Sequence, residues 1–302
     1  FIISNATPFA KSVAAGLKNI TLIEADRLLD TWELMEHADV RLQIANWRLQ
    51  IVPNIVVFKN TPKIEDICKK NDWHLLNPSA ALANKIEEKI SQVEWLDDLA
   101  KFLPPHRIDL CKNISWDGAP FILQFNRAHT GTGTMLIQNE KKLRDVQKKF
   151  PDRPARMTAY IDGPVFTNNN IVGTDTILIG NISYQITGMA PFTDNPFATI
   201  GNDWKLPHAL LSSEQKKQYG SIARAVGEKL RADGWRGLFG IDVIVEAKTR
   251  KLHLLEINAR QPASAAYESK LQSDRQTVRP SDRQTVTTFE AHLLALLGYD
   301  LS

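Results

Sequence analysis

The most informative stretch of the chain runs Gly237-Leu-Phe-Gly-Ile-Asp-Val-Ile-Val-Glu-Ala-Lys-Thr-Arg-Lys-Leu-His-Leu-Leu-Glu-Ile-Asn-Ala-Arg260. Two apolar runs flank a polar turn, and this pattern predicts an antiparallel hairpin. With the turn centred on Thr249, Asp242 lies opposite Glu256, and side chains across such a pair are about 5 Å apart. Asn258 follows two residues after Glu256 and therefore shares its face of the strand.

Two carboxylates opposed on an apolar hairpin repel each other unless a cation offsets their charge. Mg²⁺ suits this role, because it binds one or two carboxylates together with phosphate oxygens and water. We therefore expect Asp242, Glu256 and Asn258 to hold a metal ion, with Arg260 on the same line placed to hold an anion. The alternative is a solvent-facing polar stripe. A shift of one residue in register would undo the Asp242 pairing.

The N-terminal part of the chain alternates short apolar strands with short helices. The run Pro53–Phe58 predicts a buried strand, residues 62–70 predict a helix that starts near Pro62, and residues 73–76 predict a further strand. This strand–helix–strand rhythm is typical of a parallel α/β layer.

The rest of the chain shows further helix, strand and loop patterns. A capping box at Ser212 predicts the start of a helix, and Thr287 caps a last helix that Gly298 ends. The other predicted segments are a helix over 82–102, a strand over 121–125, a loop over 126–134, a helix over 139–149, a strand over 157–163, a hairpin of 174–178 with 183–187, a lid-like loop over 191–207 and a polar surface loop carrying the repeated Ser-Asp-Arg-Gln-Thr-Val of 273–278 and 281–286.

Gly-Ile-Asp-Val-Ile-Val, followed by Leu-Leu-Glu-Ile-Asn-Ala-Arg, resembles the closing motif of the ATP-grasp superfamily. The resemblance extends over roughly residues 60–270. Asn84-Lys85 resembles the pair that starts the family's first ATP-binding helix, and Pro120 to Thr134 resembles its phosphate strand and glycine-rich loop. Met157 to Gly163 resembles the strand that supplies the adenine hinge.

The resemblance implies a set of site residues. Gly131 and Gly133 leave backbone N–H groups free to approach phosphate, although a plain hairpin loop has the same composition. Gln124 stands where the family has a lysine, so a positive charge is missing there. Thr158 stands near where the family has an acidic residue. The implied cofactor-binding residues are Lys85, Gln124, Thr130, Gly131, Thr132, Gly133 and Thr158, the implied metal ligands are Asp242, Glu256 and Asn258, and the implied catalytic residue is Arg260.

The expected fold class is α/β: an N-terminal parallel α/β pre-grasp unit is followed by a two-lobed α+β ATP-grasp module. The expected domains are the N-terminal α/β pre-grasp domain over 1–80, the small lobe over 81–156 and the large lobe with the metal-binding hairpin over 157–302.

The resemblance implies an ATP- and Mg²⁺-dependent ligase that activates a carboxylate as an acylphosphate for attack by an amine and forms ADP. Two alternatives remain open. One is a bicarbonate-activating enzyme similar to carboxylases and carbamoyl-phosphate synthases. The other is a non-catalytic protein that binds a nucleotide or metabolite, an alternative favoured by Gln124 and Thr158.

Composition excludes several other classes of protein. The 302 residues include 37 Lys and Arg and 34 Asp and Glu, a balance too even to indicate a nucleic-acid or membrane partner. Only Cys68 and Cys111 are present, so a disulfide framework or cysteine-rich zinc site is excluded. The opening Phe1-Ile-Ile-Ser lacks a signal-peptide pattern, and we expect a cytoplasmic protein with small-molecule carboxylate and amine partners. The sequence does not indicate an oligomeric state.

Overall fold

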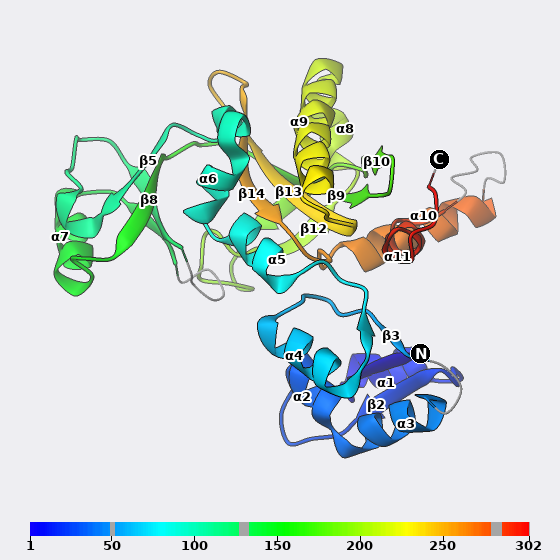
Figure 1. Ribbon diagram of the computed structural model, residues 1–302. Coiled ribbons are helices and arrows are strands. Elements are labelled where there is room, and N and C mark those ends of the chain that lie inside the picture. The colour runs from blue at the N-terminus through cyan, green and yellow to red at the C-terminus, as the bar shows by residue number, and fades with distance from the viewer. Residues whose placement is uncertain (49–51, 127–132, 279–285, 302) are drawn as a thin grey trace. The chain divides into compact units, whose positions relative to one another are not determined.

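The computed structural model describes residues 1–48, 52–126, 133–278 and 286–301. The chain divides into two compact units, Phe1–Ala81 and Leu82–Ser302 (Figure 1). The α/β class expected from the sequence is confirmed, because each unit combines helices with sheets. Within the described residues, none of the helices combines the length and the apolar character needed to cross a membrane.

The first unit contains two small parallel sheets, as the strand–helix rhythm predicts. The helix predicted from Pro62 is confirmed: Pro62–Asn71 starts at Thr61, whose hydroxyl accepts from the Ile64 amide, and ends at Asp72 in the left-handed region. The predicted strands over 53–58 and 73–76 are each shortened to two residues. The elements of this unit are β1 (Ile2–Asn5), α1 (Pro8–Ala14), β2 (Ile20–Ile23), α2 (Thr31–Glu36), α3 (Ala38–Arg48), β3 (Asn54–Ile55), α4 (Pro62–Asn71) and β4 (His74–Leu75), with β1 paired to β2 and β3 to β4.

The second unit is built around a six-stranded antiparallel sheet. The strands follow the order β12-β11-β9-β13-β14, and β10 pairs with the far end of β9. Their bounds are β9 (Val165–Val172), β10 (Ile177–Leu178), β11 (Ser183–Thr187), β12 (Thr199–Asp203), β13 (Gly237–Val245) and β14 (Leu252–Asn258).

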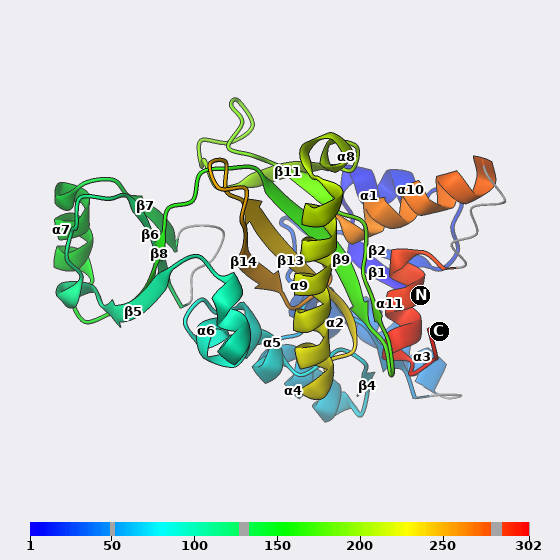
Figure 2. The same cartoon turned by 90° about the horizontal axis from the view of Figure 1, so that it is seen from above.

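Helices cover the two faces of this sheet unequally. The long helix α9 (Ser213–Ala232) crosses one face, where Tyr219 packs with Phe166 and Phe239 (Figures 1 and 2). On the other face, α10 (Ala265–Val278) and α11 (Thr288–Leu296) cover only the end that carries Ile171 and Leu238. The remainder of that face carries Asp242 and is left for a cavity.

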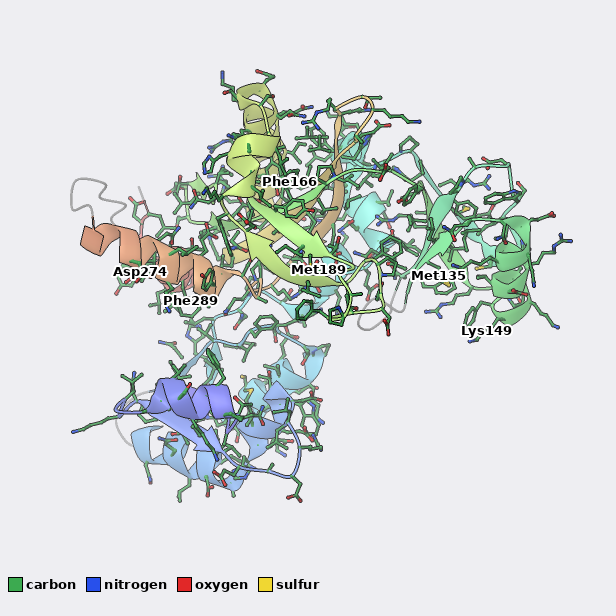
Figure 3. All side chains as sticks on the ribbon, turned by 180° about the vertical axis from the view of Figure 1, so that it is seen from behind. Met135, Lys149, Phe166, Met189, Asp274 and Phe289 are labelled. Atoms are coloured by element: carbon green, nitrogen blue, oxygen red, sulfur yellow. The ribbon has the colours of Figure 1, made fainter. Side chains whose placement is uncertain are left out.

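A four-stranded antiparallel sheet precedes the six-stranded one in the chain. Its order is β5-β8-β6-β7, and α7 packs Leu143 against Leu123 and Ile137 in its core. Figure 3 labels Met135 and Lys149 in this part of the unit, and Phe166 in the six-stranded sheet. The elements are β5 (His106–Leu110), β6 (Phe121–Phe125), β7 (Thr134–Ile137), α7 (Glu140–Lys149) and β8 (Pro154–Ala159).

The predicted continuous helix over 82–102 is wrong, because the segment is broken twice. It forms α5 (Ala80–Glu87), α6 (Ser91–Leu96) and the 3-10 helix η1 (Asp97–Phe102). At the first break, the Asn126 side-chain oxygen accepts from the Ile90 and Ser91 amides and so takes the place of helical acceptors. At the second, Asp97 has φ 50°.

Three other sequence-based predictions are corrected. Residues 177–178 and 183–187 do not form a hairpin with each other, because both pair with β9. The lid-like segment 191–207 contains β12, which pairs with β11, and the start of helix α8 (Leu206–Leu210). The first copy of the repeat, 273–278, is helical in α10 rather than a loop, and most of the second copy lies outside the described residues.

Both predicted capping boxes are confirmed. The Ser212 hydroxyl accepts from the Gln215 amide at the start of α9, and the Thr287 hydroxyl accepts from the Glu290 amide at the start of α11. Gly298, which was predicted to end the last helix, follows α11 with φ 78°. These caps satisfy amides that have no partner inside the helix.

Candidate functional site

The hairpin β13–β14 has the predicted register where it matters for the site. Asp242 pairs with Glu256, and Gly240 pairs with Asn258. Immediately beyond Asp242 the register shifts, so that Val243 faces Leu254 and one extra residue, Leu255, bulges from β14. A bulge re-aims the side chains beside it, and Leu255 and Glu256 both line the cavity described below.

The two opposed carboxylates differ in their surroundings. Burial, together with repulsion from Glu256, raises the pKa of Asp242 to about 6, although Thr167 and Gln185 partly offset this. Burial also acts to raise the pKa of Glu256, but the positive charge of Lys89, followed by that of Arg260, holds it below the ordinary value. Of the two carboxylates, Asp242 is thus the one whose negative charge is disfavoured.

Asp242 also has an unused ligand atom. Its Oδ1 is inaccessible to solvent and has no hydrogen-bond partner, whereas Oδ2 lies 3.4 Å from the Asn258 amide nitrogen. An unpaired buried carboxylate oxygen is costly unless a proton or a cation reaches it. This orphaned oxygen is therefore the feature of the hairpin that best fits a metal ion.

Two cations lower the pKa of Glu256, one from the region between α5 and α6 and one from the chain after β14. Lys89 Nζ lies 2.8 Å from Glu256 Oε1, and its side chain is only 15% exposed. Arg260 forms an ion pair with Glu87. The sequence indicated Lys85 rather than Lys89, which lies four residues later, beyond the end of α5.

A buried arginine lies beside Gln124 in the four-stranded sheet. Arg156 on β8 is the register partner of Gln124 on β6, and only 2% of its surface is exposed. Its Nη2 and Nε donate to Gln124 Oε1 at 2.6 and 3.2 Å, and its Nη1 donates to Gln92 Oε1 at 3.3 Å. Burial lowers the pKa of Arg156 to about 10, so the guanidinium stays charged at neutral pH. Sequence reasoning missed this residue.

A cavity of about 510 Å³ is lined by Asp242, Glu256, Gln124 and Arg156, whereas Asn258, Lys89 and Arg260 do not line it. Its walls come from both sheets and carry both polar and apolar side chains. The polar lining is Gln124, Thr134, Arg156, Thr158, Gln185, Asp242 and Glu256, and the apolar lining includes Leu103, Ile122, Ile161, Val165, Phe197, Ile244 and Leu255. Such a cavity can hold a ligand that has both an apolar and a charged part.

The other sequence-predicted residues are dispersed. Thr158 lines the cavity from β8, but Lys85 is exposed on the last turn of α5 and does not line it. Gly133 is buried, and its carbonyl accepts from the Phe125 amide. Thr130, Gly131 and Thr132 lie outside the described residues.

The oxygen atoms of the β13–β14 hairpin can serve as ligands for Mg²⁺. In the part of the chain that the structure describes, no group of three or more His, Cys, Asp or Glu side chains could hold a metal ion. The hairpin offers two carboxylates and one amide instead. This set fits an ion that takes its remaining ligands from phosphate and water, which is how Mg²⁺ commonly binds, and the orphaned Asp242 oxygen agrees with that fit.

Comparison with solved structures finds the same fold in known enzymes. N5-carboxyaminoimidazole synthetase from Staphylococcus aureus, complexed with ADP, matches with a TM-score of 0.61 at 15% identity and covers 92% of this chain and 67% of that one. The synthase from Aspergillus clavatus, complexed with ADP and 5-aminoimidazole ribonucleotide, also gives 0.61 at 15% identity, over 99% and 70% of the two chains. L-amino acid ligase from Bacillus licheniformis gives 0.61 at 16% identity, over 98% and 73%. The sequence matches no family model and no curated protein.

Proposed function

We propose, from the ATP-grasp fold that this chain has, that it is an ATP- and Mg²⁺-dependent ligase that joins a carboxylate to an amine and forms ADP. The observation that carries the proposal is the cavity in which Asp242 and Glu256 face the buried cation Arg156. A pre-grasp domain over 1–80, a small lobe over 81–156 and a large lobe over 157–302 are part of the proposal.

The cavity suggests how a nucleotide binds. The apolar lining residues, Ile122 and Ile161 among them, suit an adenine ring, and the polar lining residues suit the phosphates. Asp242, Glu256 and Asn258 would hold Mg²⁺, which neutralises phosphate charge and polarises the transferred phosphoryl group. Thr158 lies on the wall next to Ile122, and the glycine-rich segment 130–133 is proposed to contact the phosphates.

The proposed chemistry has two steps. A carboxylate oxygen of the first substrate attacks the γ-phosphorus of ATP, the bond to the bridging oxygen breaks, and ADP leaves. The amine nitrogen of the second substrate then attacks the acyl carbon and loses a proton, and phosphate departs with the original carboxylate oxygen. Arg260 would steady the acylphosphate, which requires it to release Glu87.

The matched structures support a small-molecule substrate. Their names include an L-amino acid ligase and synthetases of carboxyaminoimidazole, one of them bound to a ribonucleotide. The same cavity would serve bicarbonate as the activated acid. A binding role without catalysis is favoured less, because Arg156 restores a positive charge beside Gln124.

Oxygen transfer tests the function directly. The protein is incubated with Mg-ATP, a panel of amines and carboxylates labelled with ¹⁸O, or labelled bicarbonate, and the released phosphate is analysed by mass spectrometry. We expect the released phosphate to contain one ¹⁸O atom and the release of ADP to require the acid. Both the label transfer and the ADP release should be lost in Asp242→Asn. Label from bicarbonate alone would favour the bicarbonate-activating alternative. Mg-ATP binding without acid-dependent ADP release across the panel would favour a non-catalytic role.

A further inference from the structure

Arg156 is a buried cation whose contacts are all neutral. In the described part of the chain, its three hydrogen bonds go to the carboxamide oxygens of Gln124 and Gln92. Among the described residues, no carboxylate forms an ion pair with it, and Glu256 acts on it only through space. A buried charge without a counter-ion is costly, so proteins keep one only where something compensates it.

The position of Arg156 suggests what compensates the charge. It lies on the wall formed by the four-stranded sheet, whereas Asp242 and Glu256 lie on the wall formed by the six-stranded sheet. A ligand that fills the space between must be anionic toward Arg156 and must carry a cation toward the two carboxylates. A polyphosphate with a bound divalent metal ion has both properties.

We propose that Arg156 binds the phosphate chain of the nucleotide, and that Gln124 is a positioning residue that fixes the guanidinium. The inference rests on the proposed function and deepens it. The positive charge that position 124 lacks comes instead from the neighbouring strand, at the residue directly opposite in the register.

The side chain at 124 explains why the charge remains available. Gln124 Oε1 accepts two N–H groups of the guanidinium, while its Nε2 donates to the Thr134 hydroxyl at 3.2 Å. Both ends of the amide are thus fixed, and the guanidinium fork is held without being neutralised. A glutamate in the same place would form an ion pair with Arg156 and compete with phosphate.

The isosteric change Gln124→Glu separates this role from a structural one. The added ion pair holds Arg156 at least as firmly as before, so the variant folds, but we expect its Kd for Mg-ATP to rise about tenfold or more. Arg156→Gln is expected to weaken binding by at least as much, and Arg156→Lys, which keeps the charge, by less. Binding is measured by calorimetry, and melting temperatures without ligand check folding.

A double substitution can move the positive charge from position 156 on β8 to position 124 on β6. Gln124→Lys together with Arg156→Gln places one cation at position 124, and we expect this double variant to bind Mg-ATP more tightly than Arg156→Gln alone. The matched control is Arg107→Gln on β5, because Arg107 contacts Met157 and does not line the cavity. Its Kd is expected to equal that of the wild type.

The outcomes distinguish the two proposals. The role of Arg156 is overturned if folded Gln124→Glu binds Mg-ATP as tightly as the wild type and a folded variant at position 156, either Arg156→Lys or Arg156→Gln, does so too. This result would leave the proposed ligase function standing. A wild type that does not bind Mg-ATP at millimolar concentration overturns the proposed function itself.

Discussion

Asp242 and Glu256 face each other across β13 and β14, yet their pKa values move in opposite directions. The difference arises because Lys89 lies 2.8 Å from Glu256, whereas Oδ1 of Asp242 has no partner. Among the described residues, the pair therefore holds one carboxylate with an ion-pair partner and one without. A residue kept at such a cost to stability is typical of a functional site.

Asp242→Asn is expected to stabilise the ligand-free protein. The amide removes a charge disfavoured by burial and by Glu256, and the free energy of unfolding at pH 8 rises by about 1–3 kcal/mol. The pKa of Asp242 is about 6 in the folded state and 3.8 in the unfolded state, so the free energy of unfolding of the wild type falls as the pH rises from about 4 to 6. The stability difference between Asp242→Asn and the wild type therefore becomes small toward pH 4. Urea unfolding at several pH values measures the effect.

A carboxylate with the opposite shift provides the control for this prediction. Asp109 accepts from Asn113 and from the Leu110 amide, and these bonds lower its pKa. Asp109→Asn should give no gain in stability. A destabilised Asp242→Asn variant at pH 8 would show that the carboxylate is not under strain.

Lys89→Gln is expected to make the protein more sensitive to Mg²⁺ alone. The ammonium now forms an ion pair with Glu256, so its removal leaves both carboxylates without a direct ion pair among the described residues, and a divalent cation can then bind them more strongly. The variant should melt at a lower temperature than the wild type without metal, and millimolar Mg²⁺ should raise its melting temperature by more. Lys85→Gln, which changes an exposed lysine four residues earlier, should behave as the wild type does in this assay.

The Lys85 variant also tests the sequence-based assignment of that residue to nucleotide binding. Loss of Mg-ATP binding in Lys85→Gln, with unchanged binding in Lys89→Gln, would favour Lys85 over Lys89.

Protonation of His292 is expected to destabilise the fold in weak acid. Burial lowers the pKa of this histidine from 6.5 to about 4, and its Nδ1 accepts from the Leu238 amide, a bond that protonation would break. Because the unfolded state takes up the proton first, stability falls as pH drops from about 6.5 to 4, by roughly 3 kcal/mol. His292→Asn, which cannot titrate, should show a shallower loss over that window. Equal pH slopes in the two proteins would contradict this explanation.

Gly237 is expected to tolerate no side chain. It has φ 87°, and a Cβ there would lie 2.5 Å from Nδ1 of His292. Gly237→Ala should therefore cost roughly 2 kcal/mol or more of unfolding free energy, measured with denaturant. Gly234→Ala is the matched control, because Gly234 has φ 85° with nothing within 4 Å and bears backbone strain alone, about 1 kcal/mol. Equal costs at the two positions would rule out the His292 contact as the cause.

The sequence predicted the hairpin well because its alternation and its turn are local features. Asp242, Glu256 and Asn258 follow from the register alone, and the bulge at Leu255 leaves their pairing intact. Lys89 and Arg156 could not be found in this way, because their relation to the site comes from the position of the segment between α5 and α6 and from the pairing of β8 with β6.

Strand β9 is a second element that hydrophobic periodicity in the sequence does not identify. Its Thr-Asn-Asn-Asn run looks exposed, yet all four residues are buried. Asn168 and Asn170 satisfy each other's side-chain amides, and Asn169 donates to Glu268, so the polar groups are paired inside the protein. Hydrophobic periodicity cannot detect a buried strand whose side chains bond to one another.

The decisive test of a nucleotide site on this hairpin is the thermal shift that Mg-ATP causes in the wild type and in Glu256→Gln. Saturation at about 100-fold over Kd adds about 2.7 kcal/mol, which should raise the wild-type melting temperature by several degrees. We expect a much smaller shift in Glu256→Gln, and a wild-type shift in the control Glu228→Gln, which alters an ion pair on α9. The absence of any wild-type shift at millimolar Mg-ATP, or an undiminished shift in Glu256→Gln, would contradict a nucleotide site built on this hairpin.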